Sequence, residues 1–259
     1  MRVAIHRPLV ATPSRWERIV APVAAAFLAL QAARLAWAFV AWPESVGVDY
    51  HLYLAAAQRW LASGSLYLPH QLTGPYAINQ VVATDPLYPP FILWLLVPFV
   101  YLPAVLWWAI PMSLTGWSLA RLRPSPSAWL VISLLFLPAA SWQSFLWGGP
   151  SIWILAFAAL GAAYGWPAVF VLLKPTLAPF ALFGIRRRSW WIALAVFGLM
   201  CVPFGSLWVD WIRATIVNPT NSGGLAYSLP YLPVMLVPFV AWWGRHRTAP
   251  PVMASGAVL

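Results

Sequence analysis

Long apolar runs with almost no charges are the feature that most constrains this chain. About 20 apolar residues, each rising 1.5 Å in a helix, cross a hydrocarbon core of about 30 Å. Only 8% of the 259 residues are charged, against about 25% in soluble domains. We therefore expect an all-α, polytopic transmembrane helical bundle of about eight spans. The expected spans are residues 19–42, 87–103, 104–120, 128–145, 150–164, 166–184, 190–208 and 229–244.

These runs follow one another without a long polar interruption, so we expect a single transmembrane domain over residues 1–247. Residues 248–259 are expected to form a disordered tail. The first apolar run begins near Ile19 and is too long for the apolar region of a signal peptide. We expect it to remain as the first span. The single cysteine, Cys201, excludes a disulfide within the chain.

Basic clusters between the apolar runs predict the orientation, because Lys and Arg gather in cytoplasmic loops. The rule places the N-terminus in the cytoplasm of a multi-pass cell-membrane (inner or plasma membrane) protein, and three clusters agree with it. Counting spans from there places Arg121 and Arg123 outside, against the rule. The net charge of +10 comes from separate clusters and not from one continuous basic face, so it does not indicate a nucleic-acid partner. The agreeing clusters are Arg15/Arg18, residues 186–188 and Arg245/Arg247.

The same count places two longer loops on the outer side, residues 43–86 and 209–228. Four of the five acidic residues then face outward. Residues 50–63 have the pattern of an amphipathic helix lying at the membrane interface, and Gly64 is expected to end it. The outer face is therefore where we expect any chemistry.

Asp49 stands directly before this interfacial helix. One interpretation is an N-cap, in which the carboxylate accepts backbone N–H bonds. The other is a general base at the membrane surface whose pKa is tuned by partial burial. His51 follows two residues later, and an Asp-x-His pair could bind a divalent cation, but two ligands are too few to define a site. We expect no obligatory metal or other cofactor.

Asp85 and Lys174 are two further ionisable candidates. Asp85 followed by Pro86 is the pattern of a helix start, with catalysis as a weaker alternative. Lys174 is the only lysine and interrupts an apolar segment, where an ionisable residue is a functional candidate. It could also extend its amine to the membrane interface. Pro175 is expected to break the helix beside it.

Several arginines would lie on the outer side in this topology. Arginine binds phosphate through two parallel hydrogen bonds, so Arg59, Arg121 and Arg123 are candidates for holding a lipid phosphate or pyrophosphate. Each taken singly could equally anchor the chain at the interface. Tyr53, on the interfacial helix, is a candidate substrate contact.

Three segments together resemble a known enzyme family. Residues 49–57 (DYHLYLAAA) and 64–67 (GSLY) resemble the first outer loop of polyprenyl-phosphate-dependent glycosyltransferases with the GT-C fold, closest to glycosyltransferase family 87. Residues 88–103 resemble that family's second span. Residues 174–176, with the basic turn at 186–190, resemble its Lys-Pro segment. The resemblance covers roughly residues 17–215, as a short or truncated member.

The resemblance implies a mannosyltransferase-like enzyme of the cell envelope. It would move a sugar from a polyprenyl-phosphate donor to a hydroxyl of a glycan or glycolipid acceptor, with inversion, on the outer face. Asp49 maps to the family's catalytic base. Lys174, Arg121 and Arg123 are then expected to hold the leaving phosphate.

A non-catalytic membrane protein is the alternative, either a scaffold or an accessory subunit related to such transferases. Two departures favour it: family members are commonly longer, and they usually carry Gly-Gln where this chain has Gly148-Gly149. A transporter is less favoured, because the chain lacks paired broken helices in matching halves and a charged relay within its spans.

Overall fold

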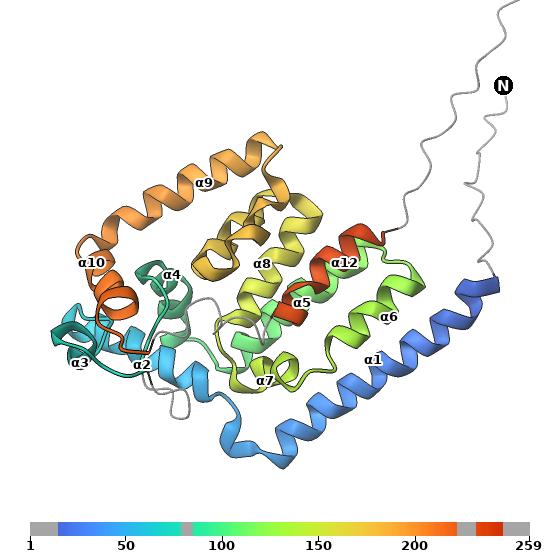
Figure 1. Ribbon diagram of the computed structural model, residues 1–259, viewed down its shortest axis with the longest axis horizontal. Coiled ribbons are helices and arrows are strands. Elements are labelled where there is room, and N and C mark those ends of the chain that lie inside the picture. The colour runs from blue at the N-terminus through green and yellow to red at the C-terminus, as the bar shows by residue number, and fades with distance from the viewer. Residues whose placement is uncertain (1–14, 79–84, 222–231, 246–259) are drawn as a thin grey trace, which may run out of the picture.

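The computed structural model describes residues 15–78, 85–221 and 232–245, and these ranges fold mainly into helices (Figure 1). The all-α class predicted from the apolar runs is confirmed for this part of the chain. In chain order the α-helices, the short 3-10 helices (η) and one π-helical turn (η7) are α1 Arg15–Ala41, η1 Pro43–Ser45, α2 Val48–Ser63, α3 Pro69–Thr73, η2 Pro90–Ile92, α4 Leu93–Leu96, η3 Val97–Val100, α5 Val105–Leu122, α6 Pro126–Leu135, α7 Ala139–Trp147, α8 Ser151–Tyr164, η4 Trp166–Leu173, η5 Pro175–Gly184, α9 Arg188–Cys201, η6 Val202–Phe204, α10 Leu207–Ile212, η7 Arg213–Val217, α11 Leu232–Met235 and α12 Val237–Trp243.

Helix α8 lies at the centre of the molecule. Its sequence is apolar on every side, which is the pattern of a helix surrounded by protein. Most of its residues are buried, including Ile154 and Ala159, which have no exposed surface. It packs mainly against α5 and η4, with further contacts to η5 and α12. Because other elements pack along α8, its start at Ser151 and its end at Tyr164 are each in contact with other parts of the protein.

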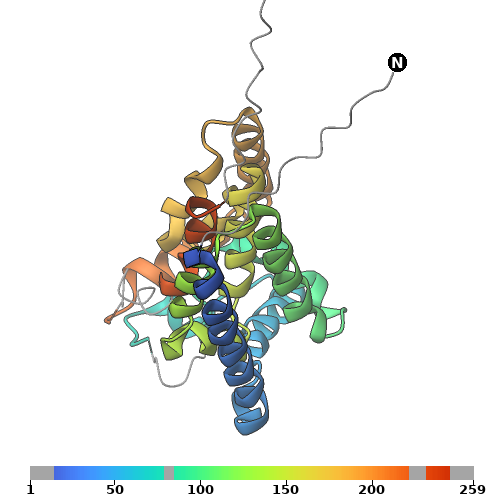
Figure 2. The same ribbon diagram turned by 90° about the vertical axis from the view of Figure 1, so that its right-hand side faces the viewer.

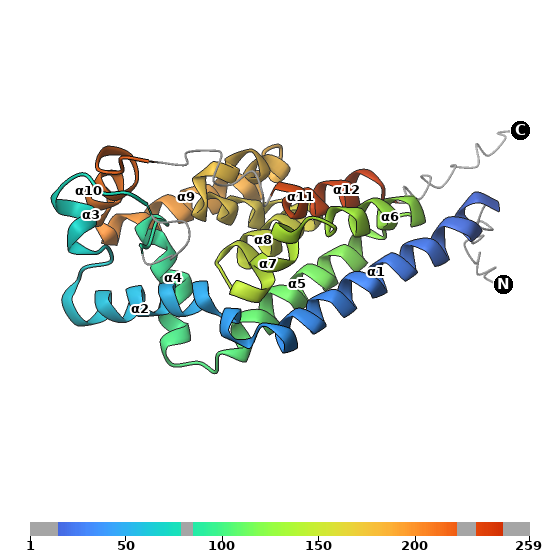
Figure 3. The ribbon, with the colours of Figure 1, turned by 60° about the horizontal axis from the view of Figure 1, so that its bottom comes forward.

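Helix α1 lies at the outside of the molecule, packed mainly on α6 (Figures 2 and 3). Only 17% of its most apolar 18-residue window is buried. Large apolar side chains on it, such as Trp16, Trp37 and Val40, are more than 60% exposed. A helix of this length and composition is able to cross a membrane.

Sharp bends interrupt most of the other apolar runs. The segment Pro90–Val100 meets α5 at 118°, α6 meets α7 at 75°, and Arg188–Phe204 meets Leu207–Val217 at 95°. Prolines lie at or near these breaks, and proline removes a helical hydrogen bond. By length and composition, the described residues contain one helix able to cross a membrane, or up to four if each bent pair is one span. The number of about eight therefore stays a prediction.

The expected span 166–184 is divided at Lys174. Two 3-10 helices, η4 and η5, lie on either side of it, and Lys174 itself has an extended backbone. The predicted break beside Pro175 is confirmed. Because η4 and η5 pack against each other, the break places Lys174 at a turn beside the start of α8.

The helix predicted at residues 50–63 is confirmed as α2, which begins two residues earlier, and its place at the membrane interface stays a prediction. Gly64 ends it as predicted, in the left-handed conformation at φ 76°, and its N–H donates to Trp60 O. The predicted N-cap role of Asp49 is wrong. Gly47 holds the cap position, also at φ 76°, and Asp49 lies in the first turn without a capping hydrogen bond.

The helix start predicted at Asp85-Pro86 is also wrong. Residues 85–89 are not helical, and the next helix, η2, begins at Pro90. The predicted tail 248–259 lies outside the described residues, and so does the part of the loop 209–228 from residue 222 onward.

Candidate functional site

The junction between α1 and α2 sets the position of Asp49. The N–H of Gly47 donates to Leu146 O at 2.9 Å, which ties this junction to the end of α7. The positive φ of Gly47 suits glycine, because the left-handed conformation crowds a β-carbon. In the first turn of α2, the carboxylate of Asp49 lies against Gly149. A β-carbon at Gly149 would lie 2.6 Å from Asp49 Oδ2.

Two tryptophans of α5 fix the turn that carries Gly149. Trp107 Nε1 donates to Gly148 O at 2.6 Å, and Trp108 Nε1 donates to Phe145 O at 2.7 Å. Gly148 has φ 68°, and a β-carbon there would lie 2.4 Å from the Trp108 ring. Both glycines are therefore required for the close packing of α2, α5 and the α7–α8 turn.

Lys174 lies on the other side of the start of α8. Its side chain is buried, with 7% exposed, and Nζ donates to Ser151 Oγ at 3.1 Å. The Tyr88 hydroxyl is 3.3 Å from the same Ser151 oxygen, and Lys174 Nζ lies 5.8 Å from the centre of the Tyr88 ring. The ring of Tyr53 packs edge-on against Tyr88 at 5.1 Å. Ser151 thus connects the lysine to the tyrosine pair.

Burial raises the pKa of the Asp49 carboxyl to about 6, and the positive charge of Lys174 acts in the opposite direction. Removal from water disfavours the charged carboxylate, whereas a nearby ammonium favours it. The carboxyl is therefore mainly ionised at neutral pH, yet it binds a proton far more readily than an ordinary aspartate. That is the property of a general base.

The structure brings some of the predicted residues together at this place. Asp49 and Lys174 interact electrostatically across the start of α8, and Tyr53 reaches the same cluster through Tyr88. His51 is exposed beside Gly47 and packs edge-on against Tyr50. In the described ranges, no group of three His, Cys, Asp or Glu side chains could hold a metal ion.

Other predicted residues lie elsewhere. Asp85 pairs with His70 at 2.8 Å, on the segment around α3. Arg59 lies ten residues after Asp49, about 15 Å further along α2. Its Nη1 atom is buried without a hydrogen-bond partner among the described residues.

Arg121 and Arg123 lie at the end of α5, around one cavity with Arg187 and Arg245. The topology predicted from the sequence had placed the first two outside and the last two inside, so that separation is wrong. Trp107 and Trp108 lie near the start of α5, which puts Arg121 roughly 20 Å from the Gly148 turn. These two arginines are therefore grouped with the other basic clusters and not with Asp49.

The Gly148-Gly149 pair and the two tryptophans were not predicted as site residues. The sequence did carry a signal for the turn, since Gly-Gly-Pro interrupts two apolar runs. Nothing in the local pattern links that turn to Asp49, about one hundred residues away. Comparisons with family models, with curated proteins and with solved structures find no match to this chain.

Proposed function

We propose that this chain is a multi-pass membrane glycosyltransferase. It moves a mannose-like sugar from a polyprenyl-phosphate donor to a hydroxyl of a glycan or glycolipid acceptor on the outer face. The observation that carries the proposal is that the Asp49 carboxylate, packed on Gly149, lies within electrostatic reach of Lys174, which is bonded to Ser151 at the start of α8. In the sequence, 125 residues separate Asp49 from Lys174. The resemblance of residues 49–57 and 174–176 to GT-C enzymes of family 87 points to the same two residues.

Exposed apolar surface supports a membrane location. Large hydrophobic side chains face outward on α1, α5 and α9, including Trp37, Val105 and Leu199, which are each more than 60% exposed. Soluble monomers rarely expose large contiguous apolar patches. With the basic clusters facing the cytoplasm, the Asp49 end of α8 faces outward, as the proposed reaction requires.

Asp49 acts as the general base. It removes the proton from the acceptor hydroxyl while the acceptor oxygen forms a bond to the anomeric carbon. The bond from that carbon to the donor phosphate breaks, and its electron pair leaves with the polyprenyl phosphate. Attack opposite to the leaving group inverts the anomeric centre. The raised pKa of Asp49, about 6, matches a base that works near neutral pH.

Lys174 stabilises the negative charge that develops on the leaving phosphate. A fixed cation in a site with little water contributes strongly to such stabilisation. Its hydrogen bond to Ser151 holds the ammonium in position before the donor arrives. Arg121 and Arg123 have no part in this step, because they lie at the other end of α5.

The accessory-subunit alternative has one observation in its favour. Lys174 is buried and already bonded to Ser151, which is also the arrangement of a lysine that only supports the fold. In that case Asp49 and Lys174 would hold α2 against α8 and bind no substrate.

A membrane assay tests the proposal. Membranes that contain the full chain are incubated with radiolabelled polyprenyl-phosphate hexoses and a lipid acceptor fraction. We expect transfer by the wild type, no transfer by Asp49→Asn, and unchanged transfer by Glu44→Gln, which removes an exposed carboxylate from the same junction. Transfer that persists in Asp49→Asn would exclude Asp49 as the base. No transfer by any variant, with normal expression, would favour the accessory role.

A further inference from the structure

Four arginines surround one cavity at the end of the molecule away from Asp49. The cavity has a volume of about 360 Å³ and is lined by Arg121 and Arg123 at the end of α5, Arg187 before α9, and Arg245 after α12. Ala162 and Ala163, near the end of α8, also line the cavity, together with Leu122 and Trp242. Segments far apart in the sequence thus bring four positive charges together.

Two of these arginines are held in place by the protein. Arg187 donates to Tyr164 O at 2.7 Å. Arg245 donates to Trp242 O, and its guanidinium lies 4.5 Å from the centre of the Trp242 ring. Their remaining N–H groups are available to a ligand, because one guanidinium carries five N–H donors.

The other two, Arg121 and Arg123, are exposed, and their side chains make no hydrogen bond or ion pair with the described residues. Arg123 also adopts φ 50°, the one non-glycine residue with positive φ in the described chain. This position, at the end of a helix, is one that glycine usually occupies. The arginine is present there although its backbone conformation is unfavourable.

Helix dipoles do not account for four cations. The C-terminal ends of α5, α8 and α12 meet here, and each carries about half a negative charge. Together they offset roughly 1.5 of the four positive charges. No carboxylate of the described chain lines the cavity. An excess of positive charge therefore remains for an anionic ligand.

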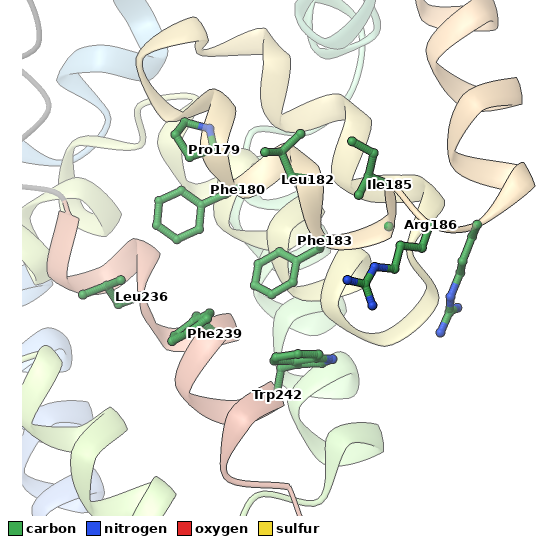
Figure 4. Close-up of a pocket in the computed structure, with 11 residues that line it drawn as sticks. Pro179, Phe180, Leu182, Phe183, Ile185, Arg186, Leu236, Phe239 and Trp242 are labelled. Carbon is green, nitrogen blue, oxygen red and sulfur yellow. The ribbon is translucent and has the colours of Figure 1, made fainter.

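A second, larger cavity adjoins the first and is mainly apolar. It has a volume of about 590 Å³ and runs between η5 and α12 (Figure 4). Phe180, Phe183 and Phe239 line it, with Arg186 at one end. Arg187 and Trp242 belong to both cavities. An aromatic groove thus adjoins the arginine cluster and shares two lining residues with it.

We propose that these two cavities form a binding site for an anionic phospholipid. The phosphate lies among Arg121, Arg123, Arg187 and Arg245, and a hydrocarbon chain lies in the groove between η5 and α12. Guanidinium groups bind phosphate through paired hydrogen bonds. Basic pockets between helices on the cytoplasmic side of membrane proteins bind such headgroups. The site is separate from Asp49 and does not depend on the proposed transferase activity.

Lipid is favoured over free phosphate because of the adjoining apolar groove. A free phosphate would use the arginines and leave the aromatic groove without an occupant. A lipid covers both surfaces at once, and its chain adds apolar burial to the charge contacts. The adjoining groove and arginines together therefore fit a lipid better than a free phosphate.

Native mass spectrometry of the full chain in detergent tests the site. The probes are palmitoyl-oleoyl phosphatidylglycerol, phosphatidylcholine with the same chains, and glycerol phosphate without chains. We expect phosphatidylglycerol to bind the wild type about tenfold more tightly than phosphatidylcholine, with no displacement by glycerol phosphate. In the double variant Arg121→Gln/Arg123→Gln, binding of phosphatidylglycerol should fall about tenfold.

Arg188→Gln is the matched control, since this exposed arginine is next to Arg187 but lines neither cavity. It should bind phosphatidylglycerol as the wild type does. An equal loss in Arg188→Gln would show general surface attraction and overturn the site. Equal binding of both lipids would also overturn it. Displacement of phosphatidylglycerol by glycerol phosphate would show that the arginines bind a free phosphate. It would overturn the proposed lipid site.

A groove variant keeps the test decisive if the double arginine variant does not fold. Phe239→Ser changes a groove wall that is 42% exposed, and it should weaken phosphatidylglycerol binding. Leu199→Ser, on a side chain that is 71% exposed on α9, is its control and should leave binding unchanged. Unchanged phosphatidylglycerol binding in Phe239→Ser would show that the hydrocarbon chain does not lie in the groove. Circular dichroism and size-exclusion chromatography verify the fold of each variant.

Discussion

The carboxylate of Asp49 packs directly on the backbone of Gly149, with no room for a β-carbon between them. This contact joins the first turn of α2 to the start of α8. It also places the carboxylate where the charge of Lys174 reaches it.

Replacing Gly149 by alanine should displace the Asp49 carboxylate, because the new β-carbon would lie 2.6 Å from Oδ2. We expect sugar transfer to fall by at least about tenfold while the chain still folds, since a small misplacement of a catalytic group costs a large factor in rate. The radiolabelled transfer assay measures it. Gly198→Ala is the control, as nothing lies within 4 Å of a β-carbon there. Equal loss in both variants would contradict the prediction.

The pH dependence of transfer should report Asp49. A base must be deprotonated to act, so the rate is expected to rise as the pH increases through about 6 and to level off above it. The rate of the wild type is measured across this range with saturating donor. Glu44→Gln should show the same profile. A rate that is constant between about pH 5 and pH 7 would mean that another group limits the reaction.

The same carboxyl should reduce stability at neutral pH. Its pKa is raised from 3.8 to about 6 in the folded chain, so the folded state binds the proton more tightly than the unfolded state. The contribution of this carboxyl to the free energy of unfolding is fully present below about pH 4. It is lost as the pH rises toward about 6. The loss amounts to at most about 3 kcal/mol.

Asp49→Asn resembles the protonated carboxyl and should therefore unfold at a higher temperature than the wild type at neutral pH. Near pH 4 the two should unfold at similar temperatures. Thermal unfolding in detergent, followed by tryptophan fluorescence, makes the comparison. A lower unfolding temperature for Asp49→Asn at neutral pH would show that the charge stabilises the fold instead.

Trp107→Phe should cost about 1–3 kcal/mol of stability, because Gly148 O loses a donor in a buried place. Trp191→Phe removes an indole bond of the same kind, to Ile185 O, at a side chain that is 55% exposed. It should cost much less, since water replaces the donor. Thermal unfolding of the two variants gives the difference. Similar costs would mean that the Trp107 bond does not hold the Gly148 turn.

Arg123→Gly should separate folding from lipid binding. Glycine adopts the left-handed conformation at φ 50° without the cost of about 1–2 kcal/mol that an L-residue pays. We expect the variant to be at least as stable as the wild type and to bind phosphatidylglycerol less tightly. Thermal unfolding and native mass spectrometry measure the two effects. A destabilised variant would mean that the arginine side chain supports the fold.

The sequence was sufficient for features that depend on local chemistry. The helix α2, its end at Gly64 and the break at Lys174-Pro175 follow from residue pattern, glycine conformation and proline geometry. Asp49 and Lys174 were singled out because a charged residue in an apolar chain is costly. Their interaction was not predicted from the residues, because it depends on how α2 and η5 pack around α8.

Features that depend on packing or on chain direction were harder to predict. The cap at Gly47 was missed because Asp49 has the right chemistry for a cap, but the backbone turns two residues earlier. Arg121 and Arg123 were placed on the wrong side of the other clusters because Pro90–Val100 was counted as a complete span. That segment has 11 residues and turns by 118° into α5, and by length and composition the two together count as one bent span.

The burial of Lys174 has a practical consequence for chemical labelling. The chain has one lysine, and only 7% of its surface is exposed, so an amine-reactive reagent has a single side-chain target, which the surrounding packing largely shields. Modification of that amine would require the packing around Ser151 to open. The rate at which the reagent reacts would therefore report how often this opening occurs.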